Sequence, residues 1–322
     1  MTTIRDVAKQ AQVSVATVSR VINKRGYVHE DTLKKVEQAI KELNYKPNDV
    51  ARSLYKKTSK SIGFIIPDIT NPFFPQLVRA VESMMIGAGY TVILFNSDEI
   101  LDHELKLIEL MESKYMDGLL IVSNTITKEH LKDLNMPVVA IDRVIDDNVP
   151  TVYVDNYKGA REAVRFLIEK GCQKIAYLNG PDKIFTAKER LRGYKAETDQ
   201  NGLPSLIYPG NYELKASMMS TIKLLAEHPD VDGIFAGNDV MAVGAIKAAS
   251  KLGYTIPEQL KIIGFDGIDL ATAITPELTT MHQPILEIGK KGSELLLQLI
   301  AGQSLEKQHY VYDARLVERN ST

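Results

Sequence analysis

The sequence predicts an α/β protein in which a small N-terminal helix-turn-helix headpiece and a hinge helix precede a core of two lobes. Each lobe is expected to be a doubly wound parallel sheet. Residues 1–46 place apolar side chains at helical spacing around a tight turn, which predicts the headpiece. From Ser61 onward, continuous apolar runs alternate with helical stretches, and this series occurs twice, which is typical of two parallel sheets covered on both faces.

Composition and charge describe an ordinary globular chain with a basic head. The 322 residues are 44% hydrophobic and 25% charged, which excludes collagen, a coiled-coil rod and bulk disorder. No apolar N-terminal segment and no run of about 18 apolar residues occurs, so we expect a cytoplasmic protein without membrane contact. Residues 1–60 carry 13 Lys and Arg against 6 Asp and Glu. This excess indicates a polyanionic partner, although a solvated surface explains the charge alone equally well.

Three short helices are predicted in the headpiece. The first covers residues 4–11, and Thr3 begins it as part of a capping box with the acidic residue three places on. Ser14 is a natural N-cap for a second helix over residues 15–23. A third helix is expected from about residue 31 to 43, with its apolar side chains facing the other two.

The segment after the headpiece predicts a short hinge helix. Asn48 caps it, and Val50, Ala51 and Leu54 fall on one side. A helix of about eight residues is not stable alone, so we expect it to form only when it packs against something.

The core is predicted to alternate strands and helices. Buried strands are expected at 62–66, 90–95, 118–122, 138–141, 174–178, 233–236 and 261–265. Helices are expected near 73–87, 101–115, 126–134, 156–170, 185–201, 214–227 and 239–252. We expect the hinge and linker at 47–60, and chain crossings between the lobes near 155–158, 283–284 and 313. These crossings assign about 61–155 and 284–313 to lobe 1, and about 156–283 and 314–322 to lobe 2.

Aromatic and polar side chains follow the ends of the predicted strands, where ligands of doubly wound sheets bind. Aromatic rings cover the C–H faces of a sugar, and amide, carboxylate and guanidinium groups hydrogen-bond its hydroxyls. This equipment suits a neutral polyol. The residues at these positions are Asn71, Phe73, Phe74, Asp142, Arg143, Asn238, Phe265, Asp266 and Gln283.

Three segments, residues 3–8, 13–23 and 43–48, resemble the headpiece of the LacI/GalR transcription regulators. The resemblance implies a homodimer on a pseudo-palindromic double-stranded DNA operator, with helix 15–23 in the major groove. Val15 and Ala16 occupy the positions that read base edges, and Leu54 the position that wedges into the minor groove. The remaining DNA contacts that it implies are Thr3, Ser14, Thr17, Ser19, Arg20, Asn23, Asn48 and Ala51.

Residues 61–319 resemble the periplasmic-binding-protein fold that forms the effector core of this family. The pattern at the strand ends is most similar to the sugar contacts of the bacterial ribose-binding protein. The resemblance therefore implies a repressor of a ribose operon whose effector is ribose or a related pentose, which acts as an inducer. The ligand contacts that it implies are Phe73, Phe74, Asp142, Arg143, Arg190, Tyr212, Asn238, Phe265, Asp266 and Gln283.

Other functions share parts of these patterns. A catabolite regulator controlled by a phosphorylated carrier protein and a purine repressor are alternatives within the family, and a solute-binding transport protein is an alternative from another class. We expect no catalytic residue, metal or cofactor, because the six histidines are scattered and no phosphate-binding or zinc motif occurs. Cys172 is expected to be an inert small hydrophobe. Helix 73–87, with Leu77, Met84 and Met85, resembles the family's dimerisation helix, although core packing explains these side chains as well.

Overall fold

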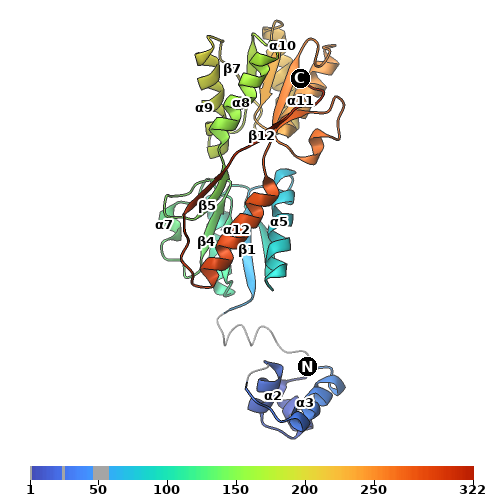
Figure 1. Ribbon diagram of the computed structural model, residues 1–322, viewed down its shortest axis with the longest axis vertical. Helices are drawn as coiled ribbons and strands as arrows, with labels where there is room; N and C mark the ends of the chain where they lie inside the picture. The colour runs from blue at the N-terminus through green and yellow to red at the C-terminus, as the bar shows by residue number, and fades with distance from the viewer. Residues whose placement is uncertain (1, 24–25, 46–57) are drawn as a thin grey trace. The chain divides into compact units, whose positions relative to one another are not determined.

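The computed structural model describes residues 2–23, 26–45 and 58–322. The chain forms two compact units, residues 1–59 and 60–322, which we call the headpiece and the core and describe separately (Figure 1). The predicted hinge residues Asn48, Ala51 and Leu54 lie outside the described residues.

The described part of the headpiece contains three helices whose starts are fixed by side-chain caps. They are α1 (Ile4–Ala11), α2 (Val15–Ile22) and α3 (Glu30–Glu42). The predicted capping box is present, since the Thr3 amide donates to the Asp6 carboxylate at 2.8 Å and Thr3 Oγ1 accepts from the Asp6 amide at 3.4 Å. These bonds from Thr3 lower the pKa of Asp6. Ser14 Oγ accepts from the Thr17 amide at 3.1 Å, as expected of the N-cap of α2.

The three helices bury one small apolar cluster. Val7, Val18 and Val36 contribute one fully buried side chain from each helix. Because this cluster uses one face of each helix, the opposite face of α2 is left to solvent, and Val15 is 41% exposed there.

Lobe 1 of the core is a six-stranded parallel sheet in the order β11-β5-β4-β3-β1-β2. Side chains of β1 alternate, so that Ile62 and Phe64 pack in one cluster with α5 and α12 while Ile65 packs in another with α6. Both faces are therefore covered, which explains why the strand is continuously apolar. The elements are β1 (Ser61–Ile66), α5 (Phe73–Gly87), β2 (Thr91–Asn96), α6 (Leu101–Ser113), β3 (Gly118–Ile121), α7 (Lys128–Leu131), β4 (Val138–Ile141), β5 (Thr151–Val154), α12 (Ile285–Ile300) and β11 (His309–Tyr312).

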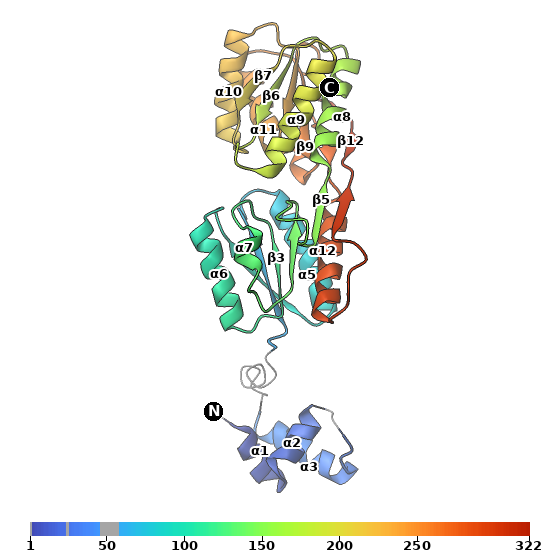
Figure 2. The same cartoon turned by 90° about the vertical axis from the view of Figure 1, so that its left-hand side faces the viewer.

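Lobe 2 repeats this design in the order β12-β10-β9-β8-β6-β7, with only β12 antiparallel to its neighbour (Figure 2). Tyr177 of β6 packs with α8 and α9, and Leu178 packs with α10 and α11 on the other face. The elements are α8 (Asn156–Glu169), β6 (Ile175–Asn179), α9 (Phe185–Gln200), β7 (Leu206–Pro209), α10 (Leu214–Glu227), β8 (Gly233–Ala236), α11 (Asp239–Lys251), β9 (Lys261–Asp266), the 3-10 helix η1 (Asp269–Ala271), β10 (Thr279–His282) and β12 (Arg315–Val317).

The chain passes between the lobes three times, after β5, after β10 and after β11. The first and third passages run together, because the Asp155 amide donates to the Tyr312 carbonyl at 2.9 Å and Lys158 Nζ lies 2.7 Å from Asp313 Oδ2. Beyond β12, Ser321 Oγ donates to the Ile262 carbonyl at 2.6 Å, which ties residues 315–322 into lobe 2.

The structure differs from the sequence prediction at five strands and at two helices. No element was predicted for β5, β7, β10, β11, β12 or α12, and the helix expected near 126–134 is only the single turn α7. Each missed strand is three or four residues long and contains a polar residue or a proline, which interrupts the apolar run. In helix α5, Leu77 and Met85 are fully buried, so both belong to the core.

Close helix packing in lobe 2 depends on Gly193 of α9. A Cβ at this position would lie 2.5 Å from the Tyr157 carbonyl of α8. We therefore expect Gly193→Ala to lower the free energy of unfolding by about 1–3 kcal/mol, because the backbones must separate. Gly87→Ala in α5, where a Cβ meets nothing within 4 Å, is the control and should leave stability unchanged or raise it. Urea titrations followed by circular dichroism measure both, and equal stabilities of the two variants would contradict the packing argument.

Candidate functional site

A cavity of about 660 Å³ lies in the core and is lined by residues of both lobes. Nine of the ten predicted ligand contacts line it: Phe73, Phe74, Asp142, Arg143, Arg190, Tyr212, Asn238, Asp266 and Gln283. The polar members meet because they stand at the carboxyl ends of parallel strands, Asp142 directly after β4 and Asp266 at the end of β9. Asp142 (φ 68°) and Asp266 (φ 114°) adopt backbone conformations with positive φ. Non-glycine residues rarely adopt such conformations outside functional sites and tight turns.

Arg190 forms the lobe 2 side of the cavity as a buried cation with three polar partners. Its Nε donates to Asn156 Oδ1 at 2.8 Å, Nη1 donates to the Gly237 carbonyl, and Nη2 lies 3.3 Å from Asp266 Oδ1. Asp266 Oδ1 also accepts from Gln283 Nε2 at 2.7 Å. These bonds fix the cavity-facing groups of three separate chain segments.

Arg143 holds the lobe 1 side. Its Nη1 donates to Glu99 Oε1, and its Nε lies 3.4 Å from Asp142 Oδ2 without hydrogen-bond geometry. Within the described residues, Arg143 Nε and Gln283 Oε1 are two of the five buried side-chain atoms that lack a hydrogen-bond partner. A buried donor and a buried acceptor on one cavity are suited to the hydroxyls of a ligand.

Two buried carboxyl groups at the cavity, Asp266 in its lining and Asp239 behind it, have raised pKa values. Burial raises the pKa of Asp266 to about 6, against the opposing effects of Arg190 and Gln283. Burial and the charge of Asp266 raise the pKa of Asp239 to about 8. Asp239 Oδ2 accepts from the Gly267 and Ile268 amides at 2.8 and 2.9 Å, so Asp239 holds the turn that presents Asp266.

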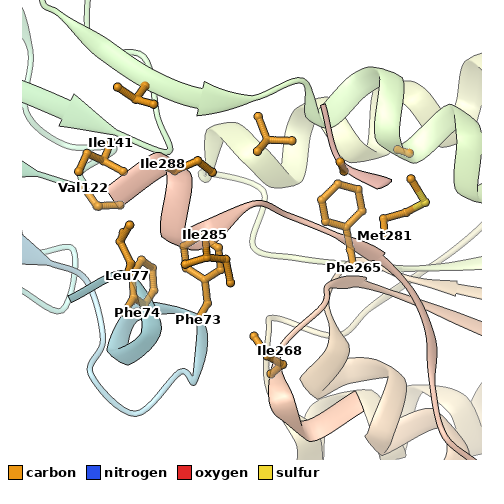
Figure 3. Packing of buried hydrophobic residues seen from close by; sticks show 14 of the residues in the cluster. Phe73, Phe74, Leu77, Val122, Ile141, Phe265, Ile268, Met281, Ile285 and Ile288 are labelled. Carbon is orange, nitrogen blue, oxygen red and sulfur yellow. The ribbon is translucent and has the colours of Figure 1, made fainter. Parts of the chain in front are cut away.

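The aromatic walls differ from the prediction at Phe265. Phe73 and Phe74 line the cavity in an edge-to-face pair with ring centroids 5.2 Å apart. Asn71, which also lines the cavity, accepts from the Phe73 amide through Oδ1 at 3.2 Å. Phe265 does not line the cavity, because its ring is fully buried and the Arg190 guanidinium covers it at 3.9 Å. Figure 3 shows Phe73 and Phe74 on one side of the apolar cluster and Phe265 on the other.

Tyr212 completes the lobe 2 wall. Its hydroxyl lies 3.4 Å from Thr186 Oγ1, which supplies a polar partner for this group. Burial raises the pKa of the Tyr212 phenol. Thr186, Asn211 and Glu99 line the cavity but were not predicted. The strand-end rule would have found Glu99, since it stands three residues after β2.

Most of the predicted DNA contacts in the headpiece lie on α2 or cap it, whereas Thr3 caps α1. Val15, Ala16 and Arg20 are exposed, whereas Asn23 donates back to the Ser19 carbonyl at 2.8 Å as the C-cap. A shallow depression of about 390 Å³ beside them was not predicted as a site. Its lining is Val13, Ser14, Thr17, Arg20, Tyr27, Val28, His29 and Thr32. Tyr27 in this lining is 88% exposed, a property that only the structure reveals.

Other candidate sites received no support from the described part of the chain. Cys172 is buried, and burial raises the pKa of its thiol to about 12, which makes a reactive thiolate unfavourable. No group of three or more His, Cys, Asp or Glu among the described residues is placed to hold a metal ion. None of the described helices is long and apolar enough to cross a membrane.

Models of known protein families match both the headpiece and the core. A model of the bacterial regulatory proteins of the lacI family matches residues 3–48, and a model of periplasmic binding proteins and the sugar binding domain of the LacI family matches residues 59–316. The chain belongs to the LacI family. This LacI-family chain is 46% identical to the ribose operon repressor of Halalkalibacterium halodurans, over 100% of its own length and 97% of that protein.

Two solved structures of the family are similar as well. A lac repressor dimer bound to operator and the anti-inducer ONPF matches with a TM-score of 0.90 at 28% identity, over 99% of this chain and 98% of that one. A LacI family transcriptional regulator from Enterococcus faecium with bound ribose matches with a TM-score of 0.74 at 29% identity, over 81% of this chain and 98% of that one.

The raised pKa of Asp239 predicts a pH effect on stability. A carboxyl group with a folded pKa of about 8 and an ordinary pKa of 3.8 favours the folded state at low pH, and this contribution is lost as the pH rises between those values. The side chain of Asp239→Asn resembles the protonated carboxyl group and does not ionise, so its contribution to stability does not fall as the pH rises. We therefore expect the variant to gain stability relative to wild type between about pH 5 and about pH 8, as measured by urea unfolding. Parallel pH curves of the two proteins would contradict the assignment.

Proposed function

We propose that the chain is a DNA-binding transcriptional repressor that senses ribose or a closely related pentose. The observation that carries this proposal is the cavity, which is lined by the phenylalanine pair Phe73 and Phe74 and by hydrogen-bonding groups from both lobes. The names of its relatives support it, since one is a ribose operon repressor and another was solved with bound ribose. The proposal includes no catalytic reaction and places the protein in the cytoplasm, where bacterial operator DNA lies.

The cavity residues divide the recognition of a pentose between them. Phe73 and Phe74 would cover its apolar C–H faces, as aromatic rings do in sugar sites. Asp142 and Asp266 would accept from ring hydroxyls, and Arg143 Nε would donate to one. The remaining contacts would come from Arg190, Tyr212, Asn238 and Gln283, while Phe265 would act only by supporting Arg190.

The headpiece would bind operator DNA through the exposed face of α2. Val15 and Ala16 are small and apolar, so they suit contact with thymine methyl groups in the major groove. Thr17, Ser19 and Arg20 would contribute further base and phosphate contacts, and Ser14 would contribute at the start of the helix. A homodimer would present two such helices to a pseudo-palindromic operator.

Sugar would control DNA binding by moving the lobes. Three passages of the chain between the lobes allow hinge closure over a ligand. Closure would move lobe 1, from which the hinge residues 48–57 lead to the headpiece. Residues Asn48, Ala51 and Leu54 would form their helix only while two copies meet, so ribose would act as an inducer.

Loss of the Asp142 carboxylate should weaken ribose binding. Asp142→Ala removes an acceptor for the sugar and leaves Arg143 with one carboxylate fewer, so the binding free energy should fall by roughly 1–3 kcal/mol or more. Isothermal titration calorimetry measures this change. Asp133→Ala, at an exposed carboxylate of lobe 1, should bind like wild type. If wild type binds a purine or another sugar but not ribose, the effector assignment is wrong.

Ribose should also weaken operator binding. We expect saturating ribose to reduce operator affinity by about 1–3 kcal/mol, a usual size for allosteric coupling. Fluorescence anisotropy of a labelled operator at one fixed salt concentration measures the effect, because salt alone shifts such affinities strongly. Tighter operator binding with ribose would make the sugar a corepressor, and no change would remove the coupling from the proposal.

A further inference from the structure

The charge of the cavity sets a limit on the sugars it can accept. Seven of its lining side chains are Asp or Glu, and three are Lys or Arg. An anionic ligand therefore meets an excess of negative charge in a confined space, where charges interact more strongly than in open water. A neutral sugar meets no such repulsion.

Both arginines are already paired with carboxylates, which weakens their attraction for an incoming phosphate. Arg190 is occupied by Asn156, the Gly237 carbonyl and Asp266, and its side chain is 4% exposed. Arg143 is equally buried, and its Nη1 is bound by Glu99. The carboxylates of Glu99 and Asp142 thus neutralise the guanidinium on the lobe 1 side of the cavity, and Glu99 is the one hydrogen-bonded to it.

The position of Glu99 is fixed by its backbone conformation and by a hydrogen bond to its side chain. Its backbone has a φ of 55°, which turns the chain sharply after β2. Glu99 Oε1 also accepts from Asn124 Nδ2 at 3.0 Å, and Asn124 Oδ1 accepts from the Phe185 amide of lobe 2 at 2.9 Å. The carboxylate is therefore braced by a contact that crosses between the lobes.

We propose that Glu99 is a specificity residue that makes the cavity select free ribose over ribose 5-phosphate, by neutralising Arg143 and adding a negative charge. The inference rests on the proposed function, since it concerns the same site. Arginine is well suited to bidentate binding of phosphate, so without Glu99 the Arg143 guanidinium would attract a phosphorylated sugar.

Calorimetry with D-ribose and D-ribose 5-phosphate tests the proposal on the full chain. Wild type should bind ribose and prefer it strongly, and Glu99→Gln should reduce the preference by about tenfold or more. The control is Asp102→Asn, which removes the same charge from the exposed first turn of α6, outside the cavity, and should keep the wild-type preference.

The outcomes separate the two proposals. If wild type binds neither sugar, the proposed function fails; if it binds both equally, only the specificity proposal fails. An unchanged preference in Glu99→Gln would also overturn it. If circular dichroism shows that Glu99→Gln does not fold, Glu99→Ala supplies the second test, because it also removes the negative charge and must reduce the preference by about tenfold or more.

Discussion

The buried positive charge of Arg190 is the constraint on which the architecture of the cavity depends. Removing a guanidinium from water is costly unless its donors are satisfied and an opposite charge lies near. Here the partners come from the start of α8, the end of β8 and the end of β9, and the ring of Phe265 covers the remaining face. The contacts that satisfy Arg190 therefore also hold the elements of lobe 2 together and fix the positions of its cavity-lining groups.

Lobe 1 shapes its half of the cavity mainly through the backbone. Asp98, Glu99 and Asp142 all have positive φ, and Asn211, Tyr212 and Asp266 of lobe 2 share this property. Non-glycine residues hold such conformations only where the surrounding structure enforces them. These residues are concentrated at one cavity. Their backbone conformations cost stability, and they place side chains in the cavity where a helix or strand would not.

The sequence predicted the fold and much of the cavity, for a physical reason. A polar residue that follows a continuous apolar strand can be recognised in the sequence. Parallel strands bring such residues together at one edge of the sheet, as with Asp142 and Asp266. Arg190 was found only by resemblance, because it lies within a helix. The burial of Phe265 under Arg190 was not predictable, since it depends on a side chain 75 positions away. Edge strands such as β7 were missed because one exposed face leaves little apolar signal.

The interleaving of the lobes has a consequence for how the chain folds during synthesis. The headpiece is built from one continuous stretch, so it can fold as soon as it leaves the ribosome. Lobe 1 needs α12 and β11, which follow all of β6 to β10, and lobe 2 needs β12 and the Ser321 bonds to Ile262. Neither lobe can therefore complete its sheet until residues near the end of the chain have been synthesised, and both sheets keep an open edge until then. Over that interval they expose apolar surface and unpaired strand edges, the features that make incomplete folds prone to aggregate.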